Sequence, residues 1–302
     1  MINETATYTQ IDLPLLRQKK VKLSIKREDL LFPGISGNKY RKLKYNIAAA
    51  KAAKQHTLLT FGGAFSNHLA AVAFAGKLHG FNTIGVVRGE ELATQPLNPT
   101  LKKAQDNGMR FHFISRADYK NKHRPLFVAK LRETFGPFYL LPEGGSNALA
   151  VKGCSEILND QDRVYSHIGV AVGTGGTLSG LAEGAFSHQQ ILGFPALKGT
   201  FLQKDICNFT LQKNWTLIEG YDYGGYAKLP THLVAFANQF KRDTQVGLDP
   251  IYTAKMMAGL WDLIERDFFA SGDHILAIHT GGLQAIEGMN ERLQNQGSAL
   301  LI

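Results

Sequence analysis

The chain of 302 residues is 44% hydrophobic and 20% charged, which are values of a globular protein large enough for two domains. No apolar run reaches the roughly 18 residues of a membrane span, and the first residues lack the charged-then-apolar order of a signal peptide, so we expect a cytoplasmic protein without a membrane partner. The net charge of +9 is spread along the chain and forms no basic runs interleaved with aromatic residues, so we expect no nucleic-acid partner.

The first half of the chain alternates predicted strands with predicted helices. The expected strands are 57–61, 82–87, 109–114 and 138–141, and the expected helices are 68–80, 99–108 and 118–136. Gly80 and Gly108 stand where a left-handed helix end is expected, and Pro125 marks a start or a break in the third helix. Because this alternation is typical of parallel βαβ units, residues 48–148 are predicted to form a small inserted α/β domain.

The second half repeats the pattern. Strands are expected at 166–172, 191–194, within 215–222 and at 274–282, and helices at 178–186 and 249–269. In the last helix Asp249 is the expected N-cap and Pro250 the first helical residue, and apolar side chains at helical spacing predict a core face: Met256, Met257, Leu260, Trp261 and Ile264. The predicted fold is α/β, with two open, twisted, mostly parallel sheets covered by helices on both faces. Residues 1–47 and 149–302 form the predicted large domain.

The chain contains two cysteines, Cys154 and Cys207. They have no CxxC partner, which argues against a disulfide scaffold and against a zinc site. We therefore expect two buried thiols and no bound metal.

Gly-containing turns at the carboxyl ends of strands are the candidate ligand sites, because open α/β sheets bind ligands there. The strongest is "VGTGGTLSG" (172–180), in which three glycines allow close approach of a ligand and two threonines add hydroxyl groups. Together with the amides that open the next helix, this loop predicts an anion site suited to phosphate. It lacks the Gly-Lys-Ser/Thr ending of a P-loop and the spacing of a dinucleotide site; a tight turn without a ligand is the alternative.

A second turn, "TFGGAFSNHLAA" (60–71), places Ser66 and Asn67 at a helix entrance. That entrance can bind a carboxylate through backbone amides and the Ser66 hydroxyl. The alternative is that one of the two side chains only caps the helix.

A third stretch, "SGNKYRKLKYN" (36–46), places Lys39 near a helix start. The positive end of the helix and the nearby Arg41 and Lys42 disfavour the charged form of Lys39 and lower its pKa. A neutral lysine amine is what Schiff-base chemistry requires. The alternative is a solvated basic face.

A fourth turn, "HTGG" (279–282), follows a predicted buried strand and places the Thr280 hydroxyl where it could meet a heterocycle nitrogen. A Schiff-base lysine, a phosphate site, a carboxylate site and this neutral hydroxyl together predict a site for pyridoxal 5'-phosphate (PLP), which serves as an electron sink.

The chain resembles the tryptophan-synthase β-like PLP enzymes of fold type II, and most closely the 1-aminocyclopropane-1-carboxylate (ACC) deaminase / D-cysteine desulfhydrase family. The resemblance covers nearly the whole chain in order, through "IKREDLLFPGISGNKYRKL", "GGAFSNHLAA", "LPEGGSNALAVKG", "VGTGGTLSGL", "GLDPIYTAKMMAGL" and "IHTGG". It implies PLP in the cleft between two domains, a small amino-acid substrate and a homodimer.

The resemblance also implies roles for individual residues. Lys39 would hold the cofactor covalently, Asn67 would bond its ring hydroxyl and Thr280 would meet its ring nitrogen. Lys42 would support a phosphate cradle made of Gly173, Thr174, Gly175, Gly176 and Thr177. Ser66 would bind the substrate carboxylate and take part in proton transfer, and the implied substrate-binding set is Ser66, Asn67, His68, Tyr226 and Tyr252, of which both tyrosines and Ser66 join Lys39 as catalytic residues.

Two positions separate the branches of that family. The ring-opening branch has Glu directly after the tyrosine of "DPxY" and Leu before the final "GG", whereas this chain has Thr253 and Thr280. We therefore expect α,β-elimination like that of D-cysteine desulfhydrase, with ACC ring opening as the nearest alternative. Another eliminase or a racemase, and a PLP-binding protein without catalysis, are further alternatives. The loop "YDYGGYAKLP" departs from the family's usual Gly-Tyr-Gly, and the region 184–214 is trimmed.

Overall fold

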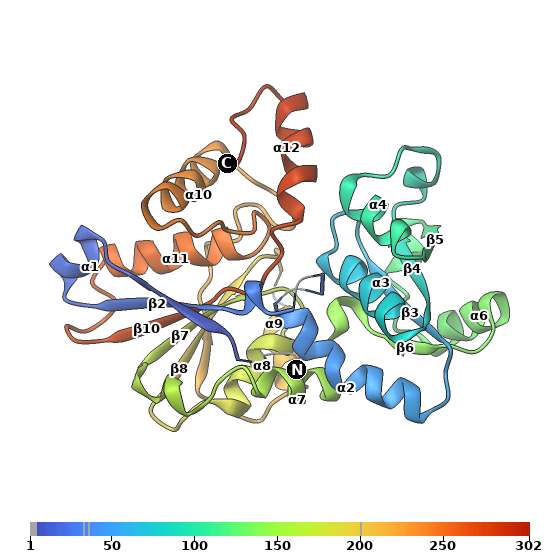
Figure 1. The fold of residues 1–302 in the computed structure, drawn as a ribbon, viewed down its shortest axis with the longest axis horizontal. Coiled ribbons are helices and arrows are strands. Elements are labelled where there is room, and N and C mark those ends of the chain that lie inside the picture. The colour runs from blue at the N-terminus through green and yellow to red at the C-terminus, as the bar shows by residue number, and fades with distance from the viewer. Residues whose placement is uncertain (1–4, 33, 36, 200) are drawn as a thin grey trace.

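The computed structural model describes residues 5–32, 34–35, 37–199 and 201–302. They form two bodies that lie side by side, each built around one sheet (Figure 1). Within these residues, none of the helices is long and apolar enough to cross a membrane.

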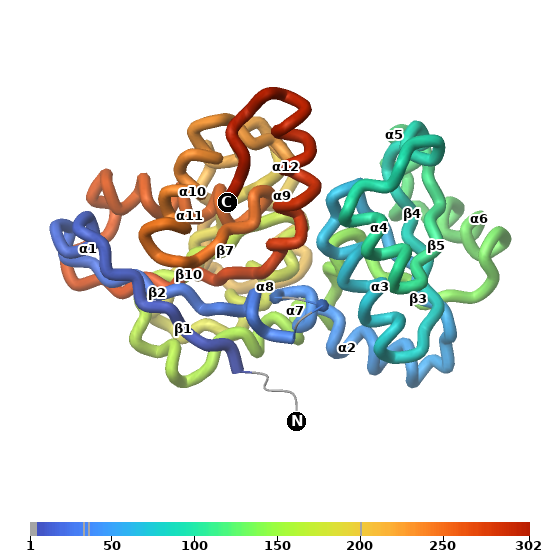
Figure 2. Tube along the Cα trace, turned by 45° about the horizontal axis from the view of Figure 1, so that its top comes forward, coloured from blue at the N-terminus to red at the C-terminus, as the bar shows by residue number. Residues whose placement is uncertain are grey.

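The larger body contains a six-stranded sheet that joins both ends of the chain. Figure 2 shows its first two strands beside the last one, although most of the chain separates them. Only the first pair is antiparallel. In sheet order the strands are β1 (Thr7–Ile11), β2 (Lys22–Arg27), β10 (His274–Ile278), β7 (His167–Val172), β8 (Gln190–Pro195) and β9 (Trp215–Leu217).

The smaller body contains a four-stranded sheet in which every pair is parallel. In sheet order its strands are β5 (Met109–Ile114), β4 (Asn82–Arg88), β3 (Thr57–Gly62) and β6 (Tyr139–Leu141). Its helices are α3 (Asn67–His79), α4 (Pro99–Asp106), α5 (Arg116–Tyr119) and α6 (Pro125–Phe135). All these strands lie inside the predicted insertion 48–148. The domain boundaries themselves stay a prediction, and the one at 47/48 falls within a helix.

That helix, α2 (Asn38–Ala52), runs from the larger body to the smaller one (Figure 1) and packs against α7 and α3. The remaining helices belong to the larger body: α1 (Pro14–Lys19), α7 (Ala148–Ser155), α8 (Gly176–Gly184), α9 (Phe201–Cys207), α10 (Thr231–Thr244), α11 (Thr253–Glu265) and α12 (Ala285–Asn295).

Each sheet has a hydrophobic core on both faces, because alternate side chains of a strand point to opposite sides. In β10, Ile275 and Ala277 pack with α1, α10, α11 and α12, whereas Leu276 and Ile278 pack with α7, α8 and α9. In β3, Leu58 packs with α3 and α4 on one face, and its neighbour Leu59 packs with α5 and α6 on the other. The predicted fold class, two mostly parallel sheets with helices on both faces, is confirmed.

Most predicted elements are present, and the differences have local causes. Residues 118–136 form two helices instead of one, separated by turns at 120–124, and Pro125 is the first residue of the second. Gly80 ends α3 in the left-handed conformation, as predicted. The methionine-rich face of α11 is buried as predicted, with Trp261 packed at its edge. The strands β1 and β2 were not among the predicted elements.

Two expectations were wrong. Asp249 is not the N-cap of α11 and Pro250 is not its first residue, because the helix begins at Thr253 after a turn. The Asp249 carboxylate instead accepts backbone hydrogen bonds within that turn, from Ile251 and Tyr252. Of the two thiols only Cys154 is buried, whereas Cys207 is exposed on α9 beside the inward-facing Ile206.

Candidate active site

A cavity of about 700 Å³ lies between the two bodies. Its walls come from the carboxyl ends of β3, β7 and β10, where open α/β sheets bind ligands. All the residues predicted to bind cofactor or substrate line this cavity, except Gly176. Gly176 lies within the loop 173–177 and is the first residue of α8.

The start of α2 enters this cavity because of an unusual backbone at Gly37. This residue has φ +60° and ψ −143°, and a Cβ there would lie 2.0 Å from the backbone oxygen of Thr280. Only glycine fits so close an approach. The turn directs Asn38 and Lys39 between the bodies, while Ser36 lies outside the described residues.

Lys39 has the perturbed amine that the sequence predicted. Its pKa is lowered from 10.5 to about 7, first because burial disfavours the charged form and then because Lys42 is close. Its Nζ donates to Oδ1 of Asn38 at 3.0 Å. Near neutral pH a large fraction of this amine is therefore unprotonated and nucleophilic.

Arg41, expected to lower this pKa, does not contribute to it. Arg41 does not point at Lys39 but forms a buried bidentate ion pair with Glu28, at 3.0 and 3.1 Å. Lys44 lies farther along α2 and pairs with Glu156. Of the four basic residues in this stretch, Lys39 and Lys42 line the cavity.

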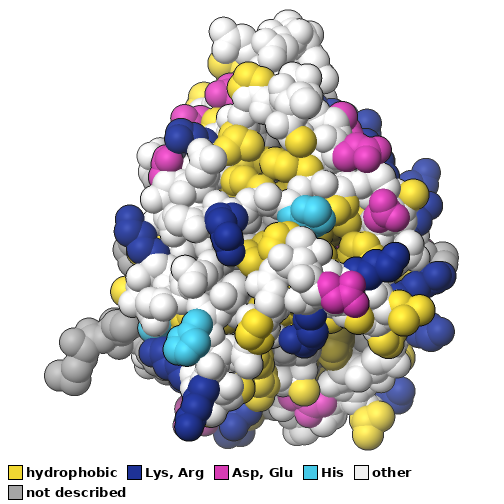
Figure 3. Space-filling model, turned by 90° about the vertical axis from the view of Figure 1, so that its right-hand side faces the viewer, with side chains coloured by type: hydrophobic (Ala, Val, Ile, Leu, Met, Phe, Trp, Pro, Cys, Tyr) yellow, Lys and Arg dark blue, Asp and Glu magenta, His cyan; other side chains and the backbone are white. Residues whose placement is uncertain are grey.

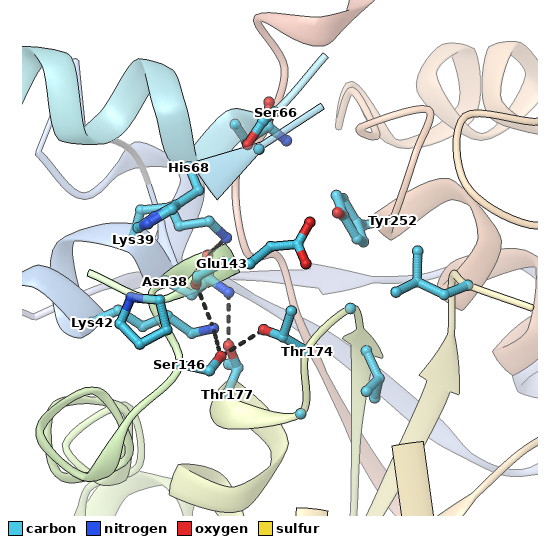
Figure 4. A pocket seen from close by; sticks show the side chains of 18 of the residues that line it. Asn38, Lys39, Lys42, Ser66, His68, Glu143, Ser146, Thr174, Thr177 and Tyr252 are labelled. Atoms are coloured by element: carbon cyan, nitrogen blue, oxygen red, sulfur yellow. Dashed lines mark hydrogen bonds between the residues drawn. The ribbon is translucent and has the colours of Figure 1, made fainter. Parts of the chain in front are cut away.

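The loop 173–177 and its neighbours form a polar cradle, shown in Figure 4. Thr174 and Ser146 place their hydroxyl oxygens 2.5 Å apart. Lys42 Nζ donates to Ser146 Oγ at 3.0 Å, and Asn38 Nδ2 donates to Thr177 Oγ1 at 2.8 Å. Three elements, α2, α8 and the segment before α7, thus bring hydroxyl, amide and amine groups to one point.

This cradle fits a phosphate group. A Cβ on Gly176 would lie 2.6 Å from Ser146 Oγ and 3.4 Å from Lys42 Nζ, so glycine there leaves the space beside these donors open. The helix α8 begins at this residue and directs its free amides toward the same space. Burial lowers the pKa of Lys42, and a bound anion would restore its charge.

The start of α3 supplies the second predicted binding region. Ser66 is the N-cap, and its Oγ accepts from the backbone amide of Leu69 at 3.3 Å. The capping role and a place in the cavity wall are thus combined in this residue. His68 turns its Nε2 to Thr60 Oγ1 at 2.9 Å, and burial followed by Lys39 and Lys42 holds its pKa well below the usual value. It is a neutral imidazole.

Asn67 has partners that the sequence did not indicate. Its Nδ2 donates to Asp249 at 3.2 Å, and its Oδ1 accepts from Gln284 at 2.9 Å. The buried Asp249 carboxyl has a pKa raised to about 6, because burial outweighs the hydrogen bonds that it accepts. A ligand that bonds Asn67 would therefore share this amide with two protein groups.

Tyr226 and Tyr252 meet in the cavity with their ring centres 6.5 Å apart. Burial raises the pKa of both hydroxyls, so both are protonated at neutral pH. Lys255 stabilises the turn before Tyr226. Its Nζ donates to the carbonyl oxygens of Asp222 and Gly225, each at 2.7 Å.

The two branch-distinguishing threonines are placed differently. Thr280 lines the cavity at the end of β10. Thr253 does not line it, since its Oγ1 accepts from the backbone amide of Asp249 at 2.7 Å. Thr253 therefore stabilises this turn and does not face the cavity.

Sequence reasoning missed several residues of the cavity wall. Asn38 and Ser146 stood inside the quoted motifs, next to glycines, and that proximity was the available signal. Glu143 carried the same signal beside Gly144, whereas Arg88 gave none, and no local pattern indicated the partners of these side chains. Glu143, for example, accepts from the Tyr119 hydroxyl at 2.6 Å and pairs with Lys122 at 3.2 Å.

Comparisons with known proteins agree with this geometry. A family model described as pyridoxal-phosphate dependent enzyme matches residues 4–201. A relative from Pyrococcus furiosus, provisionally described as an ACC deaminase, is 32% identical, and the match covers 86% of this chain and 84% of that protein. A bifunctional D-cysteine desulfhydrase/ACC deaminase of Arabidopsis thaliana is 30% identical over 86% of this chain and 72% of that protein.

Solved structures give the same picture. An ACC deaminase homologue aligns with a TM-score of 0.82 and 25% identity, covering 97% of this chain and 94% of that chain. An O-ureido-L-serine synthase, at 14% identity and a TM-score of 0.68 over 93% and 90% of the two chains, shares the fold. The lysine, the phosphate cradle and these matches lead to one conclusion: the chain belongs to the pyridoxal-phosphate-dependent enzymes, in the family of the ACC deaminases and D-cysteine desulfhydrases.

Proposed function

We propose that this enzyme catalyses α,β-elimination on a small amino acid, as a D-cysteine desulfhydrase does. With D-cysteine and water the products are pyruvate, hydrogen sulfide and ammonia. One observation carries the proposal: a buried lysine amine with a pKa near 7 shares a cavity with a phosphate cradle and with Ser66. Bound PLP supplies an electron sink for the bond that breaks at the substrate Cα.

In this proposal Lys39 attaches the cofactor, and the loop 173–177 with Lys42 binds its phosphate. Ser146 and Asn38 support that cradle through their bonds to Lys42 and Thr177. Asn67 bonds the ring hydroxyl while Asp249 and Gln284 fix its amide.

The protein groups then divide the work on the substrate. Ser66 Oγ and the first amides of α3 hold the substrate carboxylate. Once the substrate amine has displaced Lys39, the freed Nζ of Lys39 accepts the proton from the substrate Cα, which the low pKa of this amine allows. The protonated hydroxyls of Tyr226 and Tyr252 face the substrate. The neutral imidazole of His68 lines the cavity beside them.

The choice of elimination over ring opening rests on Thr280. A neutral hydroxyl beside the ring nitrogen does not protonate it, and the resulting milder electron sink suits expulsion of a good leaving group. Thr253 adds nothing to this choice, because its hydroxyl is bound to the Asp249 backbone outside the cavity.

ACC deamination is the second candidate. It is favoured by the pair of protonated tyrosines that meets in the cavity, since a proton donor is needed where a carbon–carbon bond opens. A relative that is 30% identical is named for both activities.

The test is an absorbance spectrum of the PLP-loaded protein, with D-cysteine, L-cysteine and ACC added in separate samples. We expect a visible band that changes with D-cysteine, together with release of sulfide. A response to ACC alone would replace elimination by ring opening. A band without turnover of any of the three would indicate a PLP-binding protein that does not catalyse these reactions.

Lys39→Ala is the control variant. It should lose both the visible band of the lysine-bound cofactor and turnover, and a variant that kept both would contradict the assignment of Lys39. A cytoplasmic location and a homodimer remain part of the proposal, the latter to be measured by light scattering of the loaded enzyme.

A further inference from the structure

Arg88 is a charged residue of the cavity wall to which the mechanism gives no role. It is the last residue of β4, in the smaller body, and lines the same cavity as Lys39. Its guanidinium carbon lies 5.8 Å from the ring centre of Tyr119 and 6.0 Å from that of Tyr226. The two rings orient the guanidinium plane without neutralising its charge.

No acidic side chain of the described residues pairs with Arg88. The carboxylate on the same wall, Glu143, is engaged elsewhere, by the Tyr119 hydroxyl and by Lys122 Nζ. Two further titratable residues line this cavity, His123 and Asp205. The pKa of His123 is lowered by burial and by Lys122, which leaves it neutral, and Asp205 forms no ion pair with the guanidinium. An arginine stays charged at every working pH, so this site presents an uncompensated cation.

The position of Arg88 connects it to the substrate end of the cavity. A Cβ on Gly63 would lie 3.7 Å from Arg88 Nη2 and 3.7 Å from Tyr226 Cε1, so these three residues meet at one point. Gly63 begins the turn that leads to Ser66, the proposed carboxylate ligand. The phosphate cradle, in contrast, is built from α2, α8 and the segment before α7.

We propose that Arg88 binds a carboxylate on the side chain of the substrate, so that the enzyme prefers amino acids whose β-substituent is negatively charged. This inference rests on the proposed function, which places the substrate beside Ser66 and Tyr226. The planar fork of arginine can hold a carboxylate through two parallel hydrogen bonds. Such a charge-assisted contact changes kcat/KM by roughly tenfold to a hundredfold.

The first test compares two thioether substrates, S-carboxymethylcysteine and S-methylcysteine, with the PLP-loaded enzyme and each enantiomer. In both, the Cα proton leaves, the Cβ–S bond breaks with its electron pair on sulfur, and water releases pyruvate and ammonia with mercaptoacetate or methanethiol. Pyruvate is measured by coupling to lactate dehydrogenase. The intrinsic difference between the leaving groups is the same for every variant, so the ratio of the two kcat/KM values isolates the side-chain carboxylate.

We expect Arg88→Gln to lower this ratio roughly tenfold to a hundredfold, and Arg88→Lys to lower it less, because lysine keeps the charge but not the fork. Arg110→Gln, at an exposed arginine in the neighbouring strand β5, is the matched control and should leave the ratio unchanged. An equal loss for both substrates in Arg88→Gln would mean that Arg88 binds the α-carboxylate, which overturns the proposal. An unchanged ratio overturns it as well.

A binding measurement separates failure of this inference from failure of the proposed function. Glutamate and glutamine are nearly isosteric and have no β-leaving group, so titration of the loaded enzyme with each, followed by its absorbance, measures affinity without turnover. Tighter binding of glutamate in the wild type, lost in Arg88→Gln, supports the role of Arg88 even where no elimination occurs. Equal affinities in the wild type contradict it even where D-cysteine is turned over.

Discussion

At the scale of single residues, the chemistry of this site depends on how burial changes the pKa of the Lys39 amine. Lys39 lies on the second position of α2, and the cavity removes most of the water that would stabilise its charged form. Lys42, one turn away, adds repulsion. The same environment keeps His68 neutral, so both basic side chains have an uncharged form near neutral pH.

We predict that acetic anhydride, a reagent that does not itself titrate, modifies Lys39 of the cofactor-free protein with a pH dependence centred near 7. The rate should rise about tenfold per pH unit below that value and level off above it, because only the neutral amine reacts and its pKa is about 7. Mass spectrometry of the modified peptides measures the rate at each lysine.

Lys51 is the internal reference for this experiment, since it is exposed at the other end of the same helix. A rate at Lys39 that still rises tenfold per unit between pH 8 and 10 would contradict the lowered pKa.

At the scale of elements, the helix α11 fixes the turn that carries Tyr226. Lys255 is 1% exposed, and its Nζ donates to the carbonyl oxygens of Asp222 and Gly225. Its pKa is lowered from 10.5 to about 8 because burial outweighs the nearby carboxylates. An interior lysine thus adds a side-chain donor to two carbonyl groups that each accept one backbone hydrogen bond within the turn.

We predict that Lys255→Met destabilises the protein by about 1–3 kcal/mol, because two carbonyl groups lose the ammonium donor and keep only one backbone hydrogen bond each. The difference in unfolding free energy between wild type and variant should grow from pH 8 to 10. Over that window the unfolded chain, with the higher pKa, binds more protons than the folded one, so raising the pH favours the folded wild type. Urea unfolding of both proteins at several pH values measures this difference.

Lys213→Met is the control, since Lys213 is an exposed lysine of the same body. It should change stability by less than about 0.5 kcal/mol. A pH-independent difference between wild type and Lys255→Met would show that Lys255 does not titrate in this range.

At the scale of the whole molecule, the cavity is shared by two bodies that each have their own sheet and cores. A ligand that contacts both must stabilise both. The charge of the molecule is distributed: Figure 3, a view onto the side of the smaller body, shows Lys and Arg side chains separated by acidic and neutral ones. On this side the surplus of +9 forms no continuous basic patch.

We predict that loading with PLP raises Tm and slows amide hydrogen exchange in both bodies, around residues 38–42, 143–146 and 173–177. At a concentration 100 times Kd the added stability is about 2.7 kcal/mol. Pyridoxal, which lacks the phosphate, should give a smaller shift, because it leaves the cradle of Lys42, Ser146 and Thr174 unused. Protection confined to one body would contradict a shared site.

Much of the architecture could be predicted from local patterns. The strand–helix alternation and the apolar face of α11 depend on neighbouring residues, so the order of most strands followed from them, although α1, α7, α9, α10 and α12 were not predicted. The Gly-rich turns after β3 and β7 were also readable, because glycines directly after a buried strand mark the edge where ligands bind. The strand β2 was missed although its polar and apolar residues alternate as in a strand, because it lies outside the strand–helix repeats and its partners are β1 and the distant β10.

The sequence by itself determined the family, and it predicted the lysine and the loop proposed to bind the phosphate, because these are short motifs whose chemistry lies within a few residues. Only the tertiary structure decided the electrostatics around them. Arg41 is removed from the site by Glu28, Asn67 is tied to Asp249 across 182 residues, and Arg88 has no acidic partner in the described chain. The physical reason is that burial and pairing depend on residues that folding brings together from distant parts of the sequence. A local sequence pattern contains no information on which of them become neighbours.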